Sequence, residues 1–142
     1  MSKPLLIAFL LADKVFREME TGKVHVAGTF NQLSATRFPM VHPQVYVYLA
    51  LTDLKAGKRI LDIEMHYIES GEKVVKVSQP MESPGPLEVI EFNLCFNHLS
   101  FRQPGNVELI LSCDDEIVAT RMLKIRESDQ LPFAGGQQSP EE

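Results

Sequence analysis

The chain has 142 residues, of which 44% are hydrophobic and 23% charged, and its formal net charge is −5 at pH 7. This is the composition of one ordinary globular domain, long enough to bury about two thirds of the surface that the unfolded chain exposes. Nucleic-acid binding requires clustered lysine and arginine to replace phosphate counterions, so the acidic balance argues against DNA or RNA as the main partner.

The most apolar stretch, residues 5–12 (LLIAFLLA), lies near the N-terminus. It is far shorter than the roughly 20 residues that span a bilayer. A signal-peptide cut after Ala8 or Ala12 would leave leucine at the third residue before the cut, where a small residue is needed. We therefore expect a mature strand in a cytoplasmic protein without a membrane segment. Its two faces would be Leu5, Ile7, Phe9 and Leu11 on one side and Leu6, Ala8, Leu10 and Ala12 on the other.

A β-hairpin is predicted directly after this stretch. Residues 18–23 (EMETGK) form a polar reversal that contains glycine, and a second strand with clear alternation follows over 23–31. Gly28 lies inside that strand, where glycine marks a bulge or a close backbone contact.

Apolar alternation predicts six further strands along the rest of the chain. Prolines make 34–43 and 79–86 irregular connections. Residues 97–105 form another connection, whose Leu99 and Phe101 tuck into the end of the core. The six strands are predicted at 45–54, 59–69, 73–78, 87–96, 106–113 and 117–126.

The pattern as a whole indicates an all-β fold. No segment of helical length carries an apolar stripe of helical period. About eight short strands separated by turn signals favour an antiparallel β-sandwich over residues 1–126, and a closed β-barrel is the runner-up. Residues 127–142 are polar, glycine-containing and acidic at their end, and are predicted to be a disordered tail.

The first 40 residues carry a recognisable pattern: an apolar strand, then ADKV at 12–15, TGKVHVAGTF at 21–30 and RFP at 37–39. This pattern resembles that of a family of small, uncharacterised bacterial proteins, recorded as a domain of unknown function. The matching residues are Asp13, Val15, Gly22, Lys23, Gly28, Phe30, Phe38 and Pro39.

The same family resembles the chain in outline over residues 4–126. Ala12 stands where many members have cysteine, so no thiol role carries over. The resemblance implies a β-sandwich and brings no known activity, substrate or catalytic residue.

One group of residues has the side chains of metal ligands. Asp62, Glu64 and His66 alternate along one predicted strand, so their side chains stand about 7 Å apart on one face. Carboxylate oxygens and imidazole bind metals, and His25 from a neighbouring strand would complete a site. A solvated outer strand face has the same pattern, and that is the more common origin of such a row.

The spacing of the cysteines and the lack of common catalytic motifs in the sequence limit the kinds of function that we expect. Cys95 and Cys113 show neither CxxC nor zinc-ligand spacing, and we expect reduced thiols, with a disulfide between neighbouring strands as the alternative. The sequence contains no GxSxG, HExxH, Walker or GxGxxG motif. We therefore expect no cofactor.

The second apolar face of the first strand points to binding. One sandwich core can cover only one face of this strand, so the face with Leu6, Ala8 and Leu10 needs another surface to cover it. Tyr46 and Tyr48 share the outer face of a later strand. We expect a non-enzymatic module that uses these five residues to bind another protein or a second copy of itself. The alternative is a metal-dependent site or enzyme at Asp62, Glu64 and His66.

Overall fold

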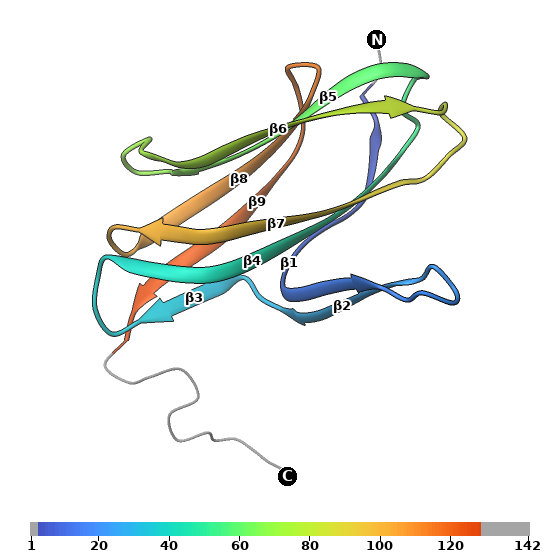
Figure 1. Ribbon diagram of the computed structural model, residues 1–142. Helices are drawn as coiled ribbons and strands as arrows, with labels where there is room; N and C mark the ends of the chain where they lie inside the picture. The colour runs from blue at the N-terminus through green and yellow to red at the C-terminus, as the bar shows by residue number, and fades with distance from the viewer. Residues whose placement is uncertain (1–2, 129–142) are drawn as a thin grey trace.

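The structure is a computed structural model that describes residues 3–128. All regular secondary structure in this range is β-strand, in agreement with the predicted all-β fold (Figure 1). The strands are β1 (Leu5–Arg17), β2 (Val24–Thr29), β3 (Gln32–Ala35), β4 (Met40–Thr52), β5 (Gly57–Tyr67), β6 (Lys73–Ser83), β7 (Ile90–Phe101), β8 (Gly105–Cys113) and β9 (Glu116–Glu127). None of the described residues belongs to a helix long and apolar enough to cross a membrane.

The strands form two sheets, which confirms the predicted sandwich. One sheet has four strands in the order β2-β1-β4-β7, and the other has five in the order β3-β9-β8-β5-β6. Neighbours are antiparallel except β3 and β9, which run parallel over four residue pairs, Gln32↔Lys124 to Ala35↔Glu127. This pair is the exception to the predicted antiparallel arrangement, and it arises because the chain crosses from one sheet to the other after β2 and returns for β4 (Figure 1).

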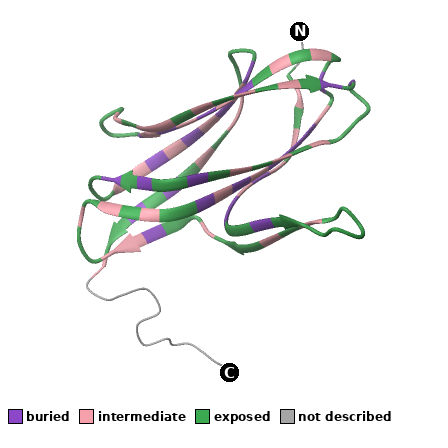
Figure 2. Cartoon of the chain, in the orientation of Figure 1, coloured by how far each residue is buried: buried purple, intermediate pink, exposed green. Residues whose placement is uncertain are grey.

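The core lies between the sheets and follows the predicted alternation. Inward side chains from the central strands are fully buried, while the polar residues between them face outward, so purple and lighter bands alternate along these strands in Figure 2. Apolar side chains with no exposed surface come from β1, β4, β5, β7, β8 and β9: Leu11, Ala12, Val45, Val47, Leu49, Leu51, Met65, Phe101, Val107, Leu109, Leu111 and Leu123.

All three predicted connections contain strand instead, and in the first of them, 34–43, β3 ends at Ala35 and β4 begins at Met40. β6 continues through Pro80 to Ser83, where a loop was expected. Pro80 lies opposite Ile60 of β5, and β6 is an edge strand. Proline has no main-chain N–H to donate, but on the outer side of an edge strand no neighbouring strand needs that hydrogen bond. β7 likewise continues to Phe101. Leu99 and Phe101 are buried as predicted, at 4% and 0% exposure.

A β-bulge in β1 changes the predicted faces of the first strand. The register between β1 and β4 shifts between Leu6 and Ala8, which leaves Ile7 as the extra residue. Leu6 consequently packs against the core, and Ile7 is 52% exposed. The expectation that Leu6 lies on the outer face is therefore wrong, because one inserted residue reverses the side-chain alternation.

The end of β1 leaves β4 and forms a hairpin with β2. β1 pairs with β4 as far as Ala12 and with β2 from Ala12 onward, so the hairpin bends away from β4 (Figure 1). The carbonyl oxygen of Val15 accepts a hydrogen bond from Asn93 Nδ2 over 3.4 Å, and Arg17 Nη2 lies 3.4 Å from Glu91 Oε1. The hairpin is thus tied to β7, which lies two strands away from β1.

The last described residues belong to the five-stranded sheet. β9 extends to Glu127, and the main-chain N–H of Ser128 donates to the carbonyl oxygen of Ala35 over 2.9 Å. The predicted tail over 127–142 therefore begins inside β9, and its residues 129–142 lie outside the described residues.

Candidate functional site

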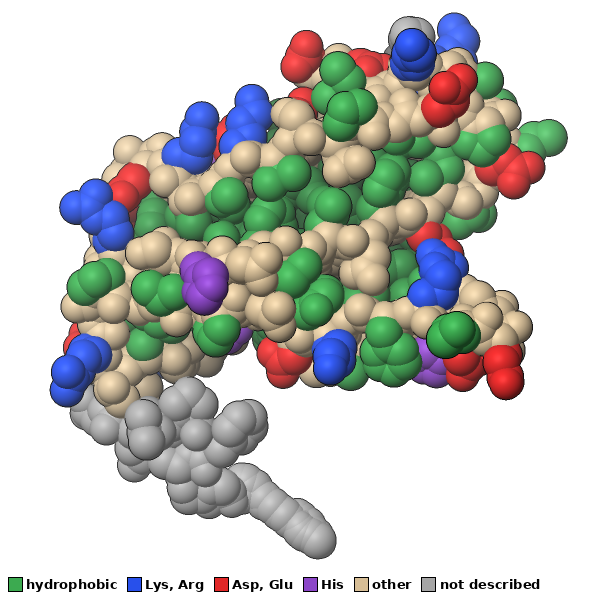
Figure 3. Space-filling view, viewed as in Figure 1, with side chains coloured by type: hydrophobic (Ala, Val, Ile, Leu, Met, Phe, Trp, Pro, Cys, Tyr) green, Lys and Arg blue, Asp and Glu red, His purple; other side chains and the backbone are tan. Residues whose placement is uncertain are grey.

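The open side of the sandwich between β6 and β7 carries apolar side chains that are only half-buried. β6 ends one sheet and β7 ends the other, and the described strands do not pair with each other here. Figure 3 shows hydrophobic side chains along the hollow between these two strands. We call these residues the β6–β7 strip: Val75, Val77, Met81, Ile90, Phe92 and Leu94.

The strip is exposed because its strands are edges, not because its residues face outward. Its members pack against the core on one side and retain solvent contact on the other. On the central strand β8, by contrast, Val107, Leu109 and Leu111 have no exposed surface. The predicted alternative, a closed barrel, would bury the strip by pairing β6 with β7, and this pairing is not formed among the described strands.

The four sheet edges differ in how well they resist pairing with another strand. β2 and β3 are short, with six and four residues. β6 carries Lys73, Lys76 and Pro80, which are features that protect an edge. β7 has twelve residues, IEFNLCFNHLSF, without lysine, arginine or proline. The outer backbone groups of β7 are therefore the least protected edge of the described sandwich.

The outer-face residues predicted from the sequence lie in the same sheet as this edge, Tyr46 and Tyr48 on the neighbouring strand β4 and Leu10 one strand further away on β1. Leu10 on β1 is opposite Tyr48 on β4, and Tyr48 is opposite Asn93 on β7. Tyr46 is likewise opposite Cys95 on β7. The structure therefore gathers four of the five predicted binding residues on one sheet face, Leu6 being the exception; the four are Ala8, Leu10, Tyr46 and Tyr48.

Tyr48 belongs to a small polar network on this face. Its hydroxyl donates a hydrogen bond to Glu91 Oε2, and the other oxygen of Glu91 faces Arg17. Burial, followed by the hydrogen bond and the negative charge of Glu91, raises the pKa of Tyr48 to about 12. The phenol therefore stays protonated at neutral pH and acts as a hydrogen-bond donor.

The predicted metal residues do share one strand face, but the structure pairs them with different partners. His66 Nδ1 lies 3.8 Å from Glu64 Oε2, and His66 Nε2 lies 3.5 Å from Glu108 Oε1 on β8. Asp62 instead accepts a hydrogen bond from the hydroxyl of Ser78 on β6. Among residues 3–128, no three His, Cys, Asp or Glu side chains are grouped so that they could hold a metal ion.

His25 does not join this row. It lies on β2 in the other sheet, where its ring stacks on Phe16 at 4.9 Å between centroids. Glu108 is the neighbour of His66 that sequence reasoning missed. Its place on an alternating strand was visible, but the pairing of β8 with β5 was not, because alternation gives the face of a strand and not its neighbour.

The cysteines also lie in different sheets. Cys95 is exposed on β7 and Cys113 is buried on β8, and both are free. The alternative of a disulfide between neighbouring strands is therefore not formed in the structure.

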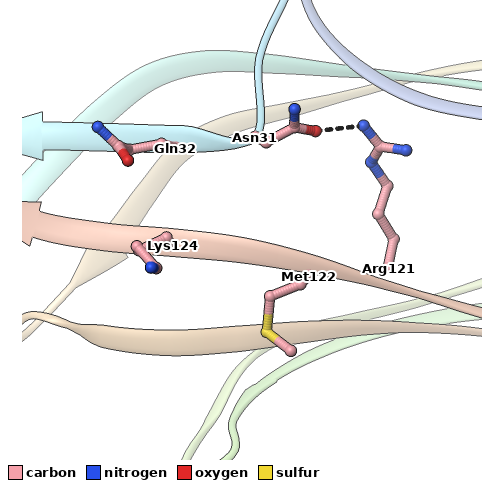
Figure 4. A pocket seen from close by; sticks show the side chains of 5 residues that line it. All are labelled: Asn31, Gln32, Arg121, Met122 and Lys124. Atoms are coloured by element: carbon pink, nitrogen blue, oxygen red, sulfur yellow. Dashed lines mark hydrogen bonds between the residues drawn. The ribbon is translucent and has the colours of Figure 1, made fainter.

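A shallow concavity of about 460 Å³ lies beside β3 and β9 (Figure 4). Arg121 points across it to Asn31, donating from Nη2 to Asn31 Oδ1 over 2.5 Å, and its Nη1 donates to the carbonyl oxygen of Phe9 over 2.8 Å. The guanidinium is thus engaged in joining the two sheets. The concavity is lined by Asn31, Gln32, Arg121, Met122 and Lys124.

Many solved structures match the chain, among them three with TM-scores below 0.5. The alkylpurine DNA glycosylase AlkC of Pseudomonas fluorescens, bound to DNA with an abasic site analog, has a TM-score of 0.45 and 11% identity, covering 68% of this chain and 28% of that chain. The β-glucosidase of Kluyveromyces marxianus has a TM-score of 0.42 and 12% identity, covering 70% and 15%. The β-glucosidase of Listeria innocua, in complex with isofagomine, has a TM-score of 0.43 and 9% identity, covering 84% and 16%.

The chain spans between 15% and 28% of the length of these three proteins. No curated protein matches the sequence. A family model matches residues 7–126, which include all the described strands except the first two residues of β1 and the last residue of β9. The chain belongs to this family, the family of unknown function DUF6941.

Proposed function

We propose that the protein is a non-enzymatic interaction module that binds a polypeptide chain along β7. The observation that supports this most directly is the free, unprotected edge of twelve residues. An added strand would find main-chain hydrogen-bond partners along this edge. The half-buried strip on one face and the tyrosines on the other would contact its side chains.

The chemistry of this region suits peptide binding. Completing the burial of Phe92 and Leu94 would contribute about 25 cal/mol for each Å² of apolar surface removed from water. On the opposite face, Leu10, Tyr46 and Tyr48 offer apolar surface together with hydroxyl groups. Tyrosine is enriched in protein interfaces because it combines these two properties.

We further propose that the protein acts in the cytoplasm of a bacterium. Cys95 is an exposed free thiol, which is typical of a reducing compartment. The resemblance of residues 12–39 to a family of small bacterial proteins supports the bacterial source. Alkylation of freshly lysed cells of the native host, with the fraction of Cys95 recovered as free thiol determined by mass spectrometry, tests the compartment; an oxidised Cys95 would contradict it.

Site-specific photo-crosslinking in the native host tests the proposed function. Benzoylphenylalanine in place of Phe92 should give polypeptide adducts, since this side chain borders the β7 edge. The same probe in place of Lys124, which is exposed on the outer face of the other sheet, is the matched control. Equal adducts at both positions, or none at Phe92, would contradict the proposal.

A further inference from the structure

The sequence of β7 also indicates which polypeptide would pair with its free edge. We infer that a second copy of this chain occupies the edge, so that β7 pairs antiparallel with β7 of the partner. This inference rests on the proposed function and names its partner. The two four-stranded sheets would then form one continuous sheet of eight strands, in the order β2-β1-β4-β7 followed by its symmetry mate.

An antiparallel edge is complementary to itself under a two-fold rotation. When a strand meets its own copy in the antiparallel sense, each outward N–H or C=O of one copy faces the opposite group of the other. The two-fold axis then stands perpendicular to the sheet, and the inner faces of both copies lie on the same side. The inward residues of β7, Ile90, Phe92 and Leu94, therefore meet apolar residues of the second copy, and the polar outer residues of β7 meet polar ones.

The charge on β7 permits this self-pairing. Glu91 is its only acidic residue, and it is already engaged by Tyr48 and Arg17. The outer residues after it are Asn93, an amide, and Cys95, a thiol. Self-pairing along β7 thus places no lysine or arginine of that strand beside its own copy.

The opposite edge of the sandwich lacks this complementarity. An incoming copy of β6 would meet Lys73 and Lys76, and lysines on an edge strand protect it from pairing. Pro80 would also leave a gap in the ladder. Charge and backbone donors therefore both favour β7 over β6.

The regular part of β7 sets the centre of the contact. His98 has a φ of +56°, and the inward alternation of Ile90, Phe92, Leu94 and Phe96 is interrupted there, since Leu99 is the next buried residue. The pairing segment therefore runs from residue 90 to 97, with the axis near Leu94. With Leu94 on the axis, Phe92 lies opposite Phe96 of the second copy and Cys95 lies opposite Asn93.

This register brings the two Cys95 thiols close together. With the axis at Leu94, Cys95 and its symmetry mate are diagonal neighbours, at about 7–8 Å. Cys113 is the other cysteine of the chain, and it is buried in the other sheet. A short bismaleimide should therefore crosslink two chains through Cys95, and the crosslink should survive Cys113→Ser and be lost in Cys95→Ser.

Sedimentation equilibrium of the full chain, over a wide concentration range, tests the association itself. We expect a species of twice the 16.0 kDa chain mass. Cys95→Lys places like charges near the axis on an exposed position and should weaken the dimer by about tenfold or more. Thr120→Lys, also exposed but on β9 of the other sheet, should leave the dimer unchanged.

Each outcome of these measurements is decisive. Loss of the dimer in Cys95→Lys alone, together with the Cys95 crosslink, supports the inference. A chain that is monomeric throughout overturns it, as does a dimer that resists Cys95→Lys and gives no Cys95 crosslink. If the chain is monomeric but the probe at Phe92 captures a different polypeptide in cells, the proposed function stands and only the identity of the partner is wrong.

Discussion

Arg121 on β9 donates from Nη1 to the carbonyl oxygen of Phe9 on β1 over 2.8 Å, and this hydrogen bond joins the two sheets one strand in from their β2 and β3 edges. Its Nη2 also donates to Asn31 Oδ1 on the segment that crosses between the sheets. Its Nε is closed off from solvent and has no hydrogen-bond partner among the described residues. The side chain therefore acts as a clamp that holds the two sheets together on one open side of the sandwich. The β6–β7 strip lies on the other open side, where Arg121 does not connect the sheets.

Replacing this clamp should destabilise the fold. Arg121→Met keeps the apolar stem but removes two charge-assisted hydrogen bonds, so the free energy of unfolding should fall by about 1.5–3 kcal/mol. Urea unfolding followed by circular dichroism measures the change. Arg102→Met is the matched control, because Arg102 pairs with Glu72 at 3.1 Å on the surface with 73% of its side chain exposed, and such pairs contribute about 0–1 kcal/mol. Equal losses in the two variants would contradict the clamp.

Gly28 should tolerate no side chain. Its φ of +73° is a left-handed conformation, and a Cβ built on it would lie 2.6 Å from Asp13 Oδ2 across the β1–β2 hairpin. Gly28→Ala combines backbone strain with this clash, so we expect a loss of about 1–3 kcal/mol in the free energy of unfolding. Gly71→Ala has a similar φ of +77° with open space around the Cβ, and isolates the strain. A smaller effect at Gly28 than at Gly71 would contradict the close contact.

The sequence predicted the faces of the strands better than their neighbours. Alternation along Val45, Val47, Leu49 and Leu51 identified the inward face of β4 correctly, because apolar side chains face the core and the polar side chains between them face the solvent. The bulge at Ile7 was not predicted, since an unbroken apolar run such as LLIAFLLA carries no marker of a change in phase.

Strand order escaped prediction for a different reason. The approach of Glu108 to His66, the parallel pairing of β3 with β9, and the free edge of β7 all depend on contacts between distant segments. The residues of the candidate site were individually visible in the sequence. What makes them a candidate site is that β7 has no second neighbour among the described strands, and a single sequence does not state this.

Tyrosine ionisation should make the fold sensitive to alkaline pH. The pKa values of Tyr46, Tyr48 and Tyr67 are all raised in the folded state, and that of Tyr48 reaches about 12. The unfolded chain releases these protons near pH 10, so their contribution to stability is present below pH 10 and is lost as the pH rises toward 12. Unfolding measured at several alkaline pH values should show this decline.

Glu91 tests the origin of the shift at Tyr48. Glu91→Gln removes the negative charge beside the phenol, so the pKa of Tyr48 should fall while burial keeps it above 10. The signal of the Tyr48 Cζ carbon in an NMR titration reports this residue alone. Glu88→Gln, in the exposed loop before β7, should leave that pKa unchanged. An unchanged pKa in Glu91→Gln would show that the hydroxyl does not contact the carboxylate in solution.

The strip and the closed core should respond differently to the same truncation. Leu111→Ala removes a side chain with no exposed surface, and we expect a loss of about 3–5 kcal/mol in the free energy of unfolding. Leu94→Ala removes a half-buried side chain, which loses less buried area, so at low protein concentration its loss should be about half as large or less. Urea unfolding of both variants at micromolar concentration measures this difference.

Protein concentration then separates the two sites further. If a second copy covers Leu94, dimerisation stabilises the native state by mass action, and Leu94→Ala weakens that stabilisation. The loss caused by Leu94→Ala should therefore grow as the protein concentration rises, whereas the loss caused by Leu111→Ala should stay constant. Equal losses at low concentration would mean that the strip is as closed as the core. A Leu94→Ala loss that does not change with concentration would mean that no second copy covers this residue.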